Sequence, residues 1–212
     1  MPFSGDRDVV LAQAGVSRET AARLDLYVAQ LTRWQNVKNL VGPATLPEVW
    51  TRHIADSLQL LDAAPAATRW LDLGSGAGIP GLILAIAGCE RPGFHADLVE
   101  SNGRKGAFLQ ETARLTGAPA RIHVARIEAV VATFTQVEVV CARALAPLPQ
   151  LLSWTAPLLK NGVTGLFPKG REVAAELTAA RETWTFEADV IPSRTDSSAG
   201  ILRISSLSGP IS

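Results

Sequence analysis

Three glycines at alternate positions, Gly74, Gly76 and Gly78, follow a short apolar run that contains Asp72. Glycines between a strand and a helix let the chain turn sharply and let a ligand approach the main chain. A second acid, Glu100, comes 22 residues after Gly78. That is close to the spacing at which nucleotide-binding α/β proteins place the carboxylate that binds ribose hydroxyls. Together these residues predict a binding site for a ligand that contains a nucleoside.

Two classes of cofactor fit this loop. Gly76, Gly78 and Gly81 match the Gly-x-Gly-x-x-Gly fingerprint of dinucleotide enzymes, which is a weak signal when it stands alone. Gly74, Gly76 and Gly78, preceded by an acid, match instead the loop that binds S-adenosylmethionine in methyltransferases. An acid beside the loop attracts the ammonium and sulfonium groups of that cofactor and repels a pyrophosphate. We therefore predict S-adenosylmethionine as the cofactor, with a purely structural tight turn as the alternative explanation of the glycines.

The rest of the chain gives little support to a dehydrogenase. The single tyrosine, Tyr27, is expected to lie far from the sheet, so the Tyr-Lys pair of short-chain dehydrogenases is missing. A chain of 212 residues also leaves no room for a separate substrate domain beside the nucleotide-binding one. Hydrophobic residues make up 47% and charged residues 19% of the chain, which is typical of a globular protein.

Charge, cysteines and hydropathy narrow the class of protein further. The formal net charge is zero and the pI is near 6.8, whereas a free-standing nucleic-acid binder is usually basic. Net charge averages over the whole surface, so a neutral total does not exclude a local basic face. The two cysteines, Cys89 and Cys141, make neither a disulfide framework nor a metal set, so no metal is predicted. We recognise no signal peptide and no membrane span, and we expect a cytoplasmic protein.

Hydrophobic periodicity and capping residues predict the elements that position the loop. Residues 17–35 and 45–61 are expected to be helices; Ser17 caps the first, and Thr45 and Glu48 have the spacing of a capping box for the second. Strands are predicted at 70–73, 96–100, 121–127, 137–142, 163–167, 185–191 and 201–207. Helices are predicted from 80 and at 103–116, 148–159 and 172–183.

Strands that alternate with helices are typical of βαβ units and a mainly parallel sheet. The last two strands are joined by a loop alone, so we expect them to be antiparallel. The sequence therefore predicts an α/β protein with the Rossmann-like fold of S-adenosylmethionine-dependent methyltransferases, a mainly parallel seven-stranded sheet whose last strand is antiparallel. Residues 1–66 form an N-terminal helical extension, and residues 67–212 form one compact methyltransferase domain.

The residues after the strand at 137–142 bear on the methyl acceptor. They read Cys141-Ala-Arg143-Ala-Leu-Ala-Pro, without the Asp/Asn-Pro-Pro-aromatic motif of enzymes that methylate exocyclic amines. We interpret Cys141 as a buried core residue and not as the nucleophile that carbon-5 pyrimidine methylation needs. Arg143 ends a central strand beside the expected cofactor cleft, where an unpaired guanidinium is costly. We predict that Arg143 binds the cofactor, a nucleobase or a phosphate.

His53 and Asp56 are further candidates for catalysis. Their three-residue spacing puts both side chains on one face of the second predicted helix. Such a pair can act as a general base, or Asp56 can hold His53 in a purely structural bond, and the residues alone leave both explanations open. A strong base is needed only where the nucleophile must lose a proton. The candidate catalytic residues are therefore His53, Asp56 and Arg143.

Several further motifs accompany the glycine loop: Trp34 with Asn39-Leu40, Arg52-His-Ile-Ala-Asp56-Ser57, Leu73 to Gly81, Glu100-Ser101, Arg126-Ile-Glu128, Arg143-Ala-Leu-Ala146 and Lys169-Gly170. With these motifs the chain resembles, over nearly its whole length, the bacterial 16S rRNA guanine-N7 methyltransferases, the RsmG or GidB family. The loop that ends in Ile-Pro-Gly, joined to the upstream Arg-His-x-x-Asp-Ser, is quite specific. The chain departs from the family pattern at Gln35-Asn36, where asparagine usually follows the tryptophan directly, and at Val41, where threonine is common.

This resemblance implies methyl transfer from S-adenosylmethionine to N7 of one guanine in the decoding region of 16S rRNA. The partner it implies is the small ribosomal subunit, with no membrane and no obligate protein partner. Guanine N7 carries a free lone pair, so the reaction requires neither a base nor a cysteine nucleophile. A methyltransferase that acts on a small molecule or a protein is the alternative.

The loop and the resemblance together predict the site residues. Glu100 is expected to hold the ribose, Ile127 and Glu128 to bracket the adenine, and Asp72 to serve the methionine end. The full set predicted to bind the cofactor is Asp72, Gly74, Ser75, Gly76, Gly78, Ile79, Glu100, Ser101, Ile127, Glu128 and Arg143. The basic residues predicted to bind RNA are Arg52, Arg104, Lys105, Arg126, Lys169 and Arg171.

Overall fold

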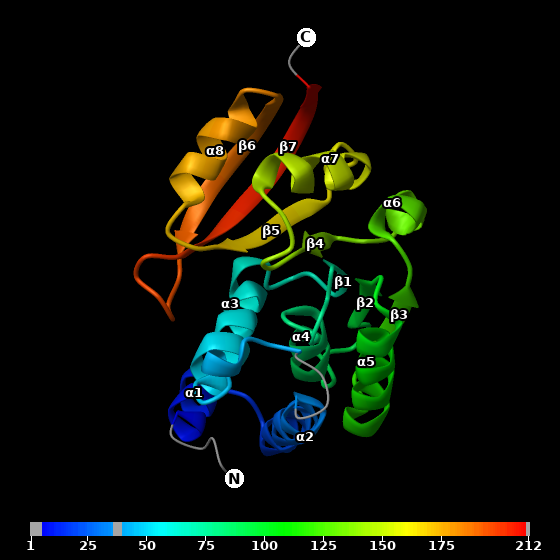
Figure 1. Ribbon diagram of the computed structural model, residues 1–212, viewed down its shortest axis with the longest axis vertical. Coiled ribbons are helices and arrows are strands. Elements are labelled where there is room, and N and C mark those ends of the chain that lie inside the picture. The colour runs from blue at the N-terminus through cyan, green and yellow to red at the C-terminus, as the bar shows by residue number, and fades with distance from the viewer. Residues whose placement is uncertain (1–5, 36–39, 211–212) are drawn as a thin grey trace.

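A seven-stranded sheet with helices on both faces forms the centre of the protein (Figure 1). The structure is a computed structural model that describes residues 6–35 and 40–210, so Asn39 of the N-terminal motif lies outside the described residues. The strands are β1 (Arg69–Leu73), β2 (His95–Glu100), β3 (Ala120–Val124), β4 (Val139–Cys141), β5 (Thr164–Lys169), β6 (Trp184–Pro192) and β7 (Gly200–Pro210).

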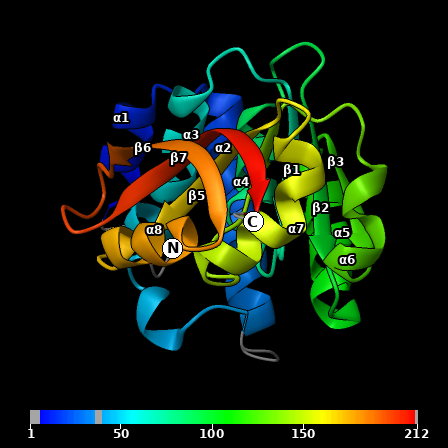
Figure 2. The same cartoon turned by 90° about the horizontal axis from the view of Figure 1, so that it is seen from above.

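The order of the strands across the sheet is β3-β2-β1-β4-β5-β7-β6. Strands β1 to β5 pair in parallel, and β7 pairs antiparallel with both β5 and β6. Figure 2 shows β6 and β7, in orange and red, curving side by side across the molecule. This confirms the predicted methyltransferase-like sheet with an antiparallel last strand. The strand order reverses between β1 and β4, and open α/β sheets bind their ligands outside the carboxyl ends of the strands at such a point.

Helices cover the sheet in two layers because successive strand residues point to opposite faces. On one face, Trp70, Leu98 and Cys141 belong to a core that also contains residues of the helices α2 to α5; on the other, Leu71 and Val99 belong to a core that contains α7. The α-helices are α1 (Arg7–Ala14), α2 (Arg18–Gln35), α3 (Asp56–Ala63), α4 (Gly81–Ala87), α5 (Gly103–Thr116), α6 (Ile127–Val130), α7 (Leu148–Leu159) and α8 (Val173–Arg181). In the described residues, no helix is long and apolar enough to cross a membrane.

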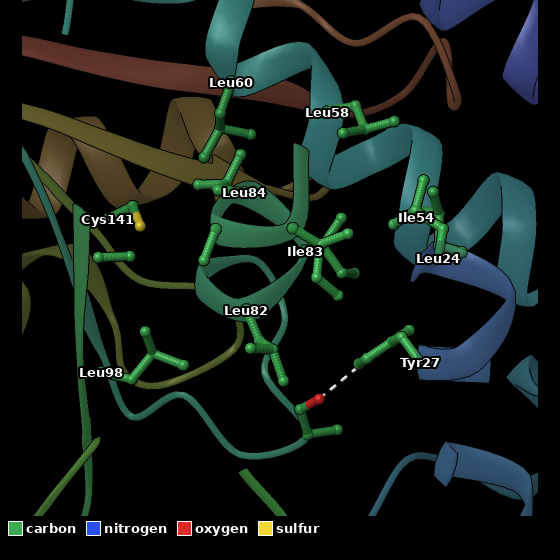
Figure 3. Close-up of a cluster of buried hydrophobic side chains, with 14 of the residues drawn as sticks. Leu24, Tyr27, Ile54, Leu58, Leu60, Leu82, Ile83, Leu84, Leu98 and Cys141 are labelled. Carbon is green, nitrogen blue, oxygen red and sulfur yellow. Dashed lines mark hydrogen bonds between the residues drawn. The ribbon is translucent and has the colours of Figure 1, made fainter. Parts of the chain in front are cut away.

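The N-terminal helices share the core of the sheet. Leu24 and Ile54 lie fully buried beside Leu82 and Ile83 of α4, as Figure 3 shows. The predicted cap of α2 is confirmed, since the Ser17 hydroxyl accepts from the amide of Thr20 at 3.0 Å. Helix α1 was not predicted; it ends at Gly15, whose left-handed φ of 60° is typical of a helix C-terminus.

The single helix predicted at 45–61 is wrong in its first half. The chain forms a short 3₁₀ helix, η1 (Pro43–Thr45), then a π-helix, η2 (Trp50–Ala55), and only then α3. Thr45 does not cap a helix with Glu48, because its hydroxyl donates to the Gly42 carbonyl and contacts the ring of His53. The Thr45 hydroxyl, which a capping box would need, is thus occupied by its contacts with Gly42 and His53. Apolar residues of this segment are buried all the same: Val49, Trp50, Ile54, Leu58 and Leu61.

Candidate active site

The glycine loop is tied to the end of β2. The amides of Gly74 and Ser75 both donate to the Val99 carbonyl, at 2.9 and 3.1 Å. The Glu100 carboxylate accepts from the Gly76 amide at 2.9 Å and from the Asn102 amide at 2.7 Å. Glu100 is only 7% exposed, yet it lines a pocket, so its remaining lone pairs can receive a ligand. The predicted pairing of the loop with Glu100 thus has a direct geometric basis.

Gly76 and Gly81 are glycines for different reasons. Gly76 has a φ of 54°, and an added Cβ would meet only the Gly74 carbonyl, at 3.7 Å. This position therefore combines a left-handed backbone with open space above the loop. Gly81 is a glycine because there is no space for a side chain: an added Cβ would lie 2.5 Å from the Cβ of Asp72. The motif's last glycine allows the start of α4 to pack directly on β1.

Asp72 is buried behind the loop and lines neither of the two pockets described below. Its Oδ2 accepts from the Gly81 amide at 3.1 Å, and the Cys141 thiol lies 3.7 Å from Oδ1. Burial raises the pKa of Asp72 to about 7, against the lowering effect of these hydrogen bonds and that of Ser75. The contacts that the structure shows for Asp72 are internal, and its predicted contact with the methionine end stays a prediction. Cys141 is fully buried, which agrees with its interpretation as a core residue.

Tyr27 lies against the glycine loop, which corrects the expectation that it is far from the sheet. Its hydroxyl donates to the Ala77 carbonyl at 3.0 Å (Figure 3). The ring is fully buried, and burial raises the pKa of the hydroxyl, so it is a neutral donor. The reason for the error is that α2 packs back on α4 and α5, which sequence distance does not reveal.

A small pocket of about 290 Å³ opens beside the glycine loop. It is lined by Gly74 and Glu100 and by the apolar side chains of Ile127, Leu145 and Trp154. A carboxylate among apolar side chains fits a nucleoside, whose hydroxyls donate and whose base is flat and apolar on its faces. The predicted residues that line it are Gly74, Glu100, Ser101, Ile127 and Glu128 from the cofactor set and Lys105 and Arg126 from the RNA set. Leu145 and Trp154 were missed, because no spacing rule connects them to the loop.

A larger pocket of about 1010 Å³ lies on the other side of Ala144 and Leu145, which line both pockets. Ala144 has a φ of 51°, which a residue other than glycine rarely adopts, so the backbone is strained where the pockets meet. The lining includes the predicted residues Arg52, Asp56, Arg143 and Lys169. Arg143 lines this pocket and not the smaller one.

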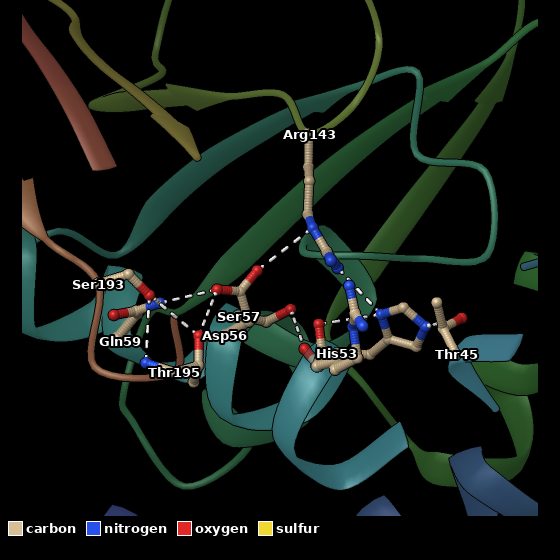
Figure 4. Close-up of polar contacts among 9 residues, drawn as sticks. Thr45, His53, Asp56, Ser57, Gln59, Arg143, Ser193 and Thr195 are labelled. Atoms are coloured by element: carbon tan, nitrogen blue, oxygen red, sulfur yellow. Dashed lines mark hydrogen bonds and ion pairs between the residues drawn. The ribbon is translucent and has the colours of Figure 1, made fainter. Parts of the chain in front are cut away.

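Arg143 extends toward α3, with Asp56 on one side of its guanidinium and His53 on the other (Figure 4). Its Nε lies 3.2 Å from Asp56 Oδ2, and its Nη1 lies 3.1 Å from His53 Nδ1. The structure thus brings together the three candidate catalytic residues. Burial, followed by the charge of Arg143, lowers the pKa of His53 to about 4, so its ring is neutral at ordinary pH.

Lys169 is the most restrained of the predicted RNA-binding residues. Its ammonium donates to Glu176 at 2.6 Å and to the Ala146 carbonyl at 3.1 Å, and its side chain is 8% exposed. Arg104 and Arg171 are exposed and line neither pocket, although each is next in sequence to a residue that does, Lys105 and Gly170. Arg52 pairs with Glu48 at 3.4 Å, and both residues line the large pocket. The contact of these cations with RNA stays a prediction.

Besides Asp72, four predicted cofactor residues line neither pocket. Ser75 is buried, and its hydroxyl donates to the Asp72 carbonyl at 3.1 Å. Ile79 packs against the core at the start of α4. The others are Gly76 and Gly78, whose positive φ angles shape the turn.

The comparisons with known proteins agree with this geometry. The family model of GidB, rRNA small subunit methyltransferase G, matches residues 20–200. A ribosomal RNA small subunit methyltransferase G from Methylobacterium nodulans is 84% identical over 98% of this chain and 99% of its own length. One from Bradyrhizobium sp. (strain BTAi1) is 50% identical over 95% of this chain and 91% of its own. The chain belongs to this family. The predicted resemblance is therefore confirmed, and the protein is a methyltransferase.

Solved structures with low sequence identity support the fold. A methyltransferase from Geobacter sulfurreducens has a TM-score of 0.60 at 12% identity and covers 86% of this chain and 88% of its own. A mutant of MtNAS in complex with S-adenosylmethionine has a TM-score of 0.57 at 13% identity and covers 95% and 84%. At such identities the likeness shows the shared fold alone.

Proposed function

We propose that this protein transfers the methyl group of S-adenosylmethionine to N7 of a guanine in the 16S rRNA of the small ribosomal subunit, in the cytoplasm. The observation that carries the proposal is the pair of adjoining pockets at the carboxyl edge of the sheet in a member of this family. The small pocket has the lining of a nucleoside site, and the large one is wide enough for an extruded nucleotide.

The small pocket holds the cofactor in this proposal. Glu100 binds the ribose hydroxyls, because its oxygens keep free lone pairs beside their bonds to two backbone amides. Ile127 and Trp154 enclose the adenine, with Ser101 and Glu128 at the edge. When bound, S-adenosylmethionine supplies an electrophilic methyl group on a sulfonium. The chain's part is to align that methyl with the acceptor atom where the two pockets adjoin, at Ala144 and Leu145.

The chemistry of the site suits an acceptor that is already nucleophilic. His53 is neutral but buried, with a pKa lowered to about 4, which makes it a poor base. Asp56 is paired with Arg143. Cys141, the cysteine nearest the site in sequence, is fully buried. Guanine N7 needs none of these groups, because its lone pair attacks without loss of a proton.

Electrostatics of the large pocket favour a product that gains positive charge. Its lining has six carboxylates (Asp6, Glu48, Asp56, Glu172, Glu176 and Asp196) against three cations (Arg52, Arg143 and Lys169). Methylation at N7 leaves a cationic base, and an excess of fixed negative charge stabilises that charge as it develops. RNA phosphates would then be bound by Arg52 in the lining of the large pocket, by Lys105 and Arg126 in that of the small pocket, and by the exposed Arg104 and Arg171.

Incubation with S-adenosylmethionine labelled in the methyl group, and with small subunits from cells that lack this gene, tests the proposal. We expect label in 16S rRNA at one site, and strand cleavage at that site after borohydride and aniline, which reports 7-methylguanosine. Glu100→Gln serves as the variant with impaired cofactor binding. Label in RNA without that cleavage would contradict N7 as the acceptor, and label confined to protein or small molecules would contradict the RNA substrate.

A further inference from the structure

Arg143 is fixed on two sides at the wall of the large pocket (Figure 4). Its Nε faces Asp56 at 3.2 Å, and its Nη1 faces His53 at 3.1 Å. A guanidinium carries five N–H donors in a rigid plane, so two such contacts determine the orientation of that plane. Within the described ranges 6–35 and 40–210, Nη2 makes no hydrogen bond or ion pair with protein, and its donors are left for a ligand.

Asp56 is occupied at both oxygens. Its Oδ1 accepts from Gln59 Nε2 at 2.9 Å and from the Thr195 hydroxyl at 3.0 Å, while Oδ2 faces Arg143. Gln59 in turn accepts from the Arg194 amide at 3.0 Å, which ties the loop between β6 and β7 to α3. Hydrogen bonds to a carboxylate stabilise its charged form and make it a poorer proton acceptor. The network thus directs one oxygen of Asp56 at Arg143.

His53 Nδ1 has two neighbours that make opposite demands. It lies 3.0 Å from the Arg52 carbonyl, to which it could only donate, and 3.1 Å from Arg143, from which it could only accept. Thr45 decides between them, because its hydroxyl gives its one proton to the Gly42 carbonyl at 2.8 Å. The Thr45 oxygen must then accept from His53 Nε2, at 2.9 Å. A proton on Nε2 leaves Nδ1 with a lone pair, which faces the guanidinium.

We propose that His53 and Asp56 are positioning residues, which aim the free donors of Arg143 at an oxygen atom of the RNA substrate. They act through Arg143 and not as a general base. The inference rests on the proposed function in one respect, since it takes the large pocket as the RNA-binding one. It adds a role for the π-helix, which carries His53 three residues before Asp56, the first residue of α3, and so helps to present both groups to one side chain.

A double-substitution cycle tests whether Asp56 acts through Arg143. The variants are Asp56→Asn, Arg143→Ala and the two combined, assayed by single-turnover methylation of unmethylated small subunits, with cofactor affinity measured by calorimetry. We expect Asp56→Asn to slow methyl transfer about 10- to 100-fold, as misplaced groups at a reaction site do, with cofactor affinity unchanged. The combined variant should be no slower than Arg143→Ala alone. The matched control is Thr195→Val, which removes a bond to the oxygen that faces away from Arg143 and should slow transfer less.

Two outcomes of this cycle would overturn the inference. One is an equal slowing by Asp56→Asn in the presence and in the absence of the Arg143 side chain, which would give Asp56 an independent role. The other is a full rate in a folded Asp56→Asn protein. A merely structural role predicts parallel losses of thermal stability and rate in all variants, including Thr195→Val.

Nitrogen-15 NMR of the histidine rings tests the His53 part without any RNA. The chain has three histidines, and His53→Gln assigns the signal. We expect a neutral ring at pH 7 with the proton on Nε2, and an Nδ1 signal that shifts in Arg143→Ala. A proton on Nδ1, or a charged ring, would overturn this part. If the NMR result holds while no RNA is labelled, the proposed function fails and the network does not.

Discussion

The two pockets at the carboxyl edge of the sheet are built in opposite ways. The small pocket takes most of its lining from strand ends and the short segments that follow them: Gly74, Val99 to Ser101, Lys105 and Ala125 to Glu128. The large pocket gathers residues from Asp6 to Ile201, and its central side chain, Arg143, is held by groups about ninety residues earlier in the chain. One pocket is therefore determined by local sequence, and the other by how distant parts of the chain pack together.

This difference separates two tasks. A loop made by strand ends repeats wherever the fold recurs, so it suits a cofactor that many enzymes share. A pocket assembled from a π-helix, a strand end and a hairpin loop depends on this chain's own long-range contacts, so it suits a particular acceptor. Substitutions in the small pocket should therefore affect cofactor binding first, and the following predictions test how far its local character extends.

Gly76→Val should have the largest effect, a loss of measurable cofactor binding. A β-branched residue at a φ of 54° costs about 1–3 kcal/mol of backbone strain, and its side chain would fill the open space above the loop. Calorimetric titration with S-adenosylmethionine measures the effect. Gly15→Val is the matched control, since Gly15 has a φ of 60° with nothing nearby, and it should lose stability while retaining affinity. Wild-type affinity in a folded Gly76→Val protein would refute the site.

Glu100→Gln should weaken cofactor binding by about 10- to 100-fold, since charge-assisted hydrogen bonds are worth about 1.5–3 kcal/mol. The amide nitrogen of glutamine would also face either the Gly76 or the Asn102 amide, donor against donor. Glu128→Gln makes the same chemical change on a half-exposed residue of the same pocket and should cost far less. Equal losses in the two variants would mean that general negative charge, and not the Glu100 contact, binds the ligand.

The small pocket could be predicted from the sequence more easily than the large one, for the same reason. Glycine spacing and Glu100 identified the small pocket, because backbone turns and strand ends obey rules of local sequence. Arg143 was recognised as a charge in a costly place, but its partners were not, because His53 and Asp56 were predicted only to pair with each other. The i, i+3 spacing of Asp56 and Gln59 on α3 was a usable signal that went unused. Thr195 gave no such signal, since its bond to Asp56 spans 139 residues.

Secondary structure shows the same limit. The alternation of strands and helices predicted the sheet, its mainly parallel order and the antiparallel end. The failures include α1, a short helix of low amphipathicity, and α6, which begins at Ile127 where a strand was predicted to continue from 121 to 127. The segment at 45–55 also failed, because a hydroxyl that could cap a helix contacts His53 instead. Propensity rules consider only partners that are close in the sequence, whereas here the Thr45 hydroxyl contacts the more distant His53.

Asp72→Asn tests whether the carboxyl group buried behind the small pocket is protonated in the folded protein. The pKa of Asp72 is raised to about 7 in the folded protein, so between about pH 4 and pH 7 the folded state holds a proton that the unfolded state has lost. This contribution makes the free energy of unfolding fall as pH rises through that window, and level off above it. Asparagine cannot titrate, so the variant should lose this downward slope, measured by urea unfolding from pH 4.5 to 8. Parallel curves for the two proteins would show that Asp72 is charged when folded.

Tyr27→Phe should have the smallest effect and is the sharpest test of the local character of the loop. The substitution keeps the buried ring and leaves the Ala77 carbonyl without its donor, which costs about 1–3 kcal/mol of stability. Thr32→Ala on the same helix is the matched control, since that hydroxyl donates to Val28 within α2. If the loop is held by strand ends alone, both variants should bind S-adenosylmethionine as the wild type does. We expect instead a few-fold loss of affinity in Tyr27→Phe only, because its hydroxyl fixes the carbonyl between Gly76 and Gly78. The long-range packing that builds the large pocket would then also tune the small one, and the two would differ in degree of dependence on distant contacts.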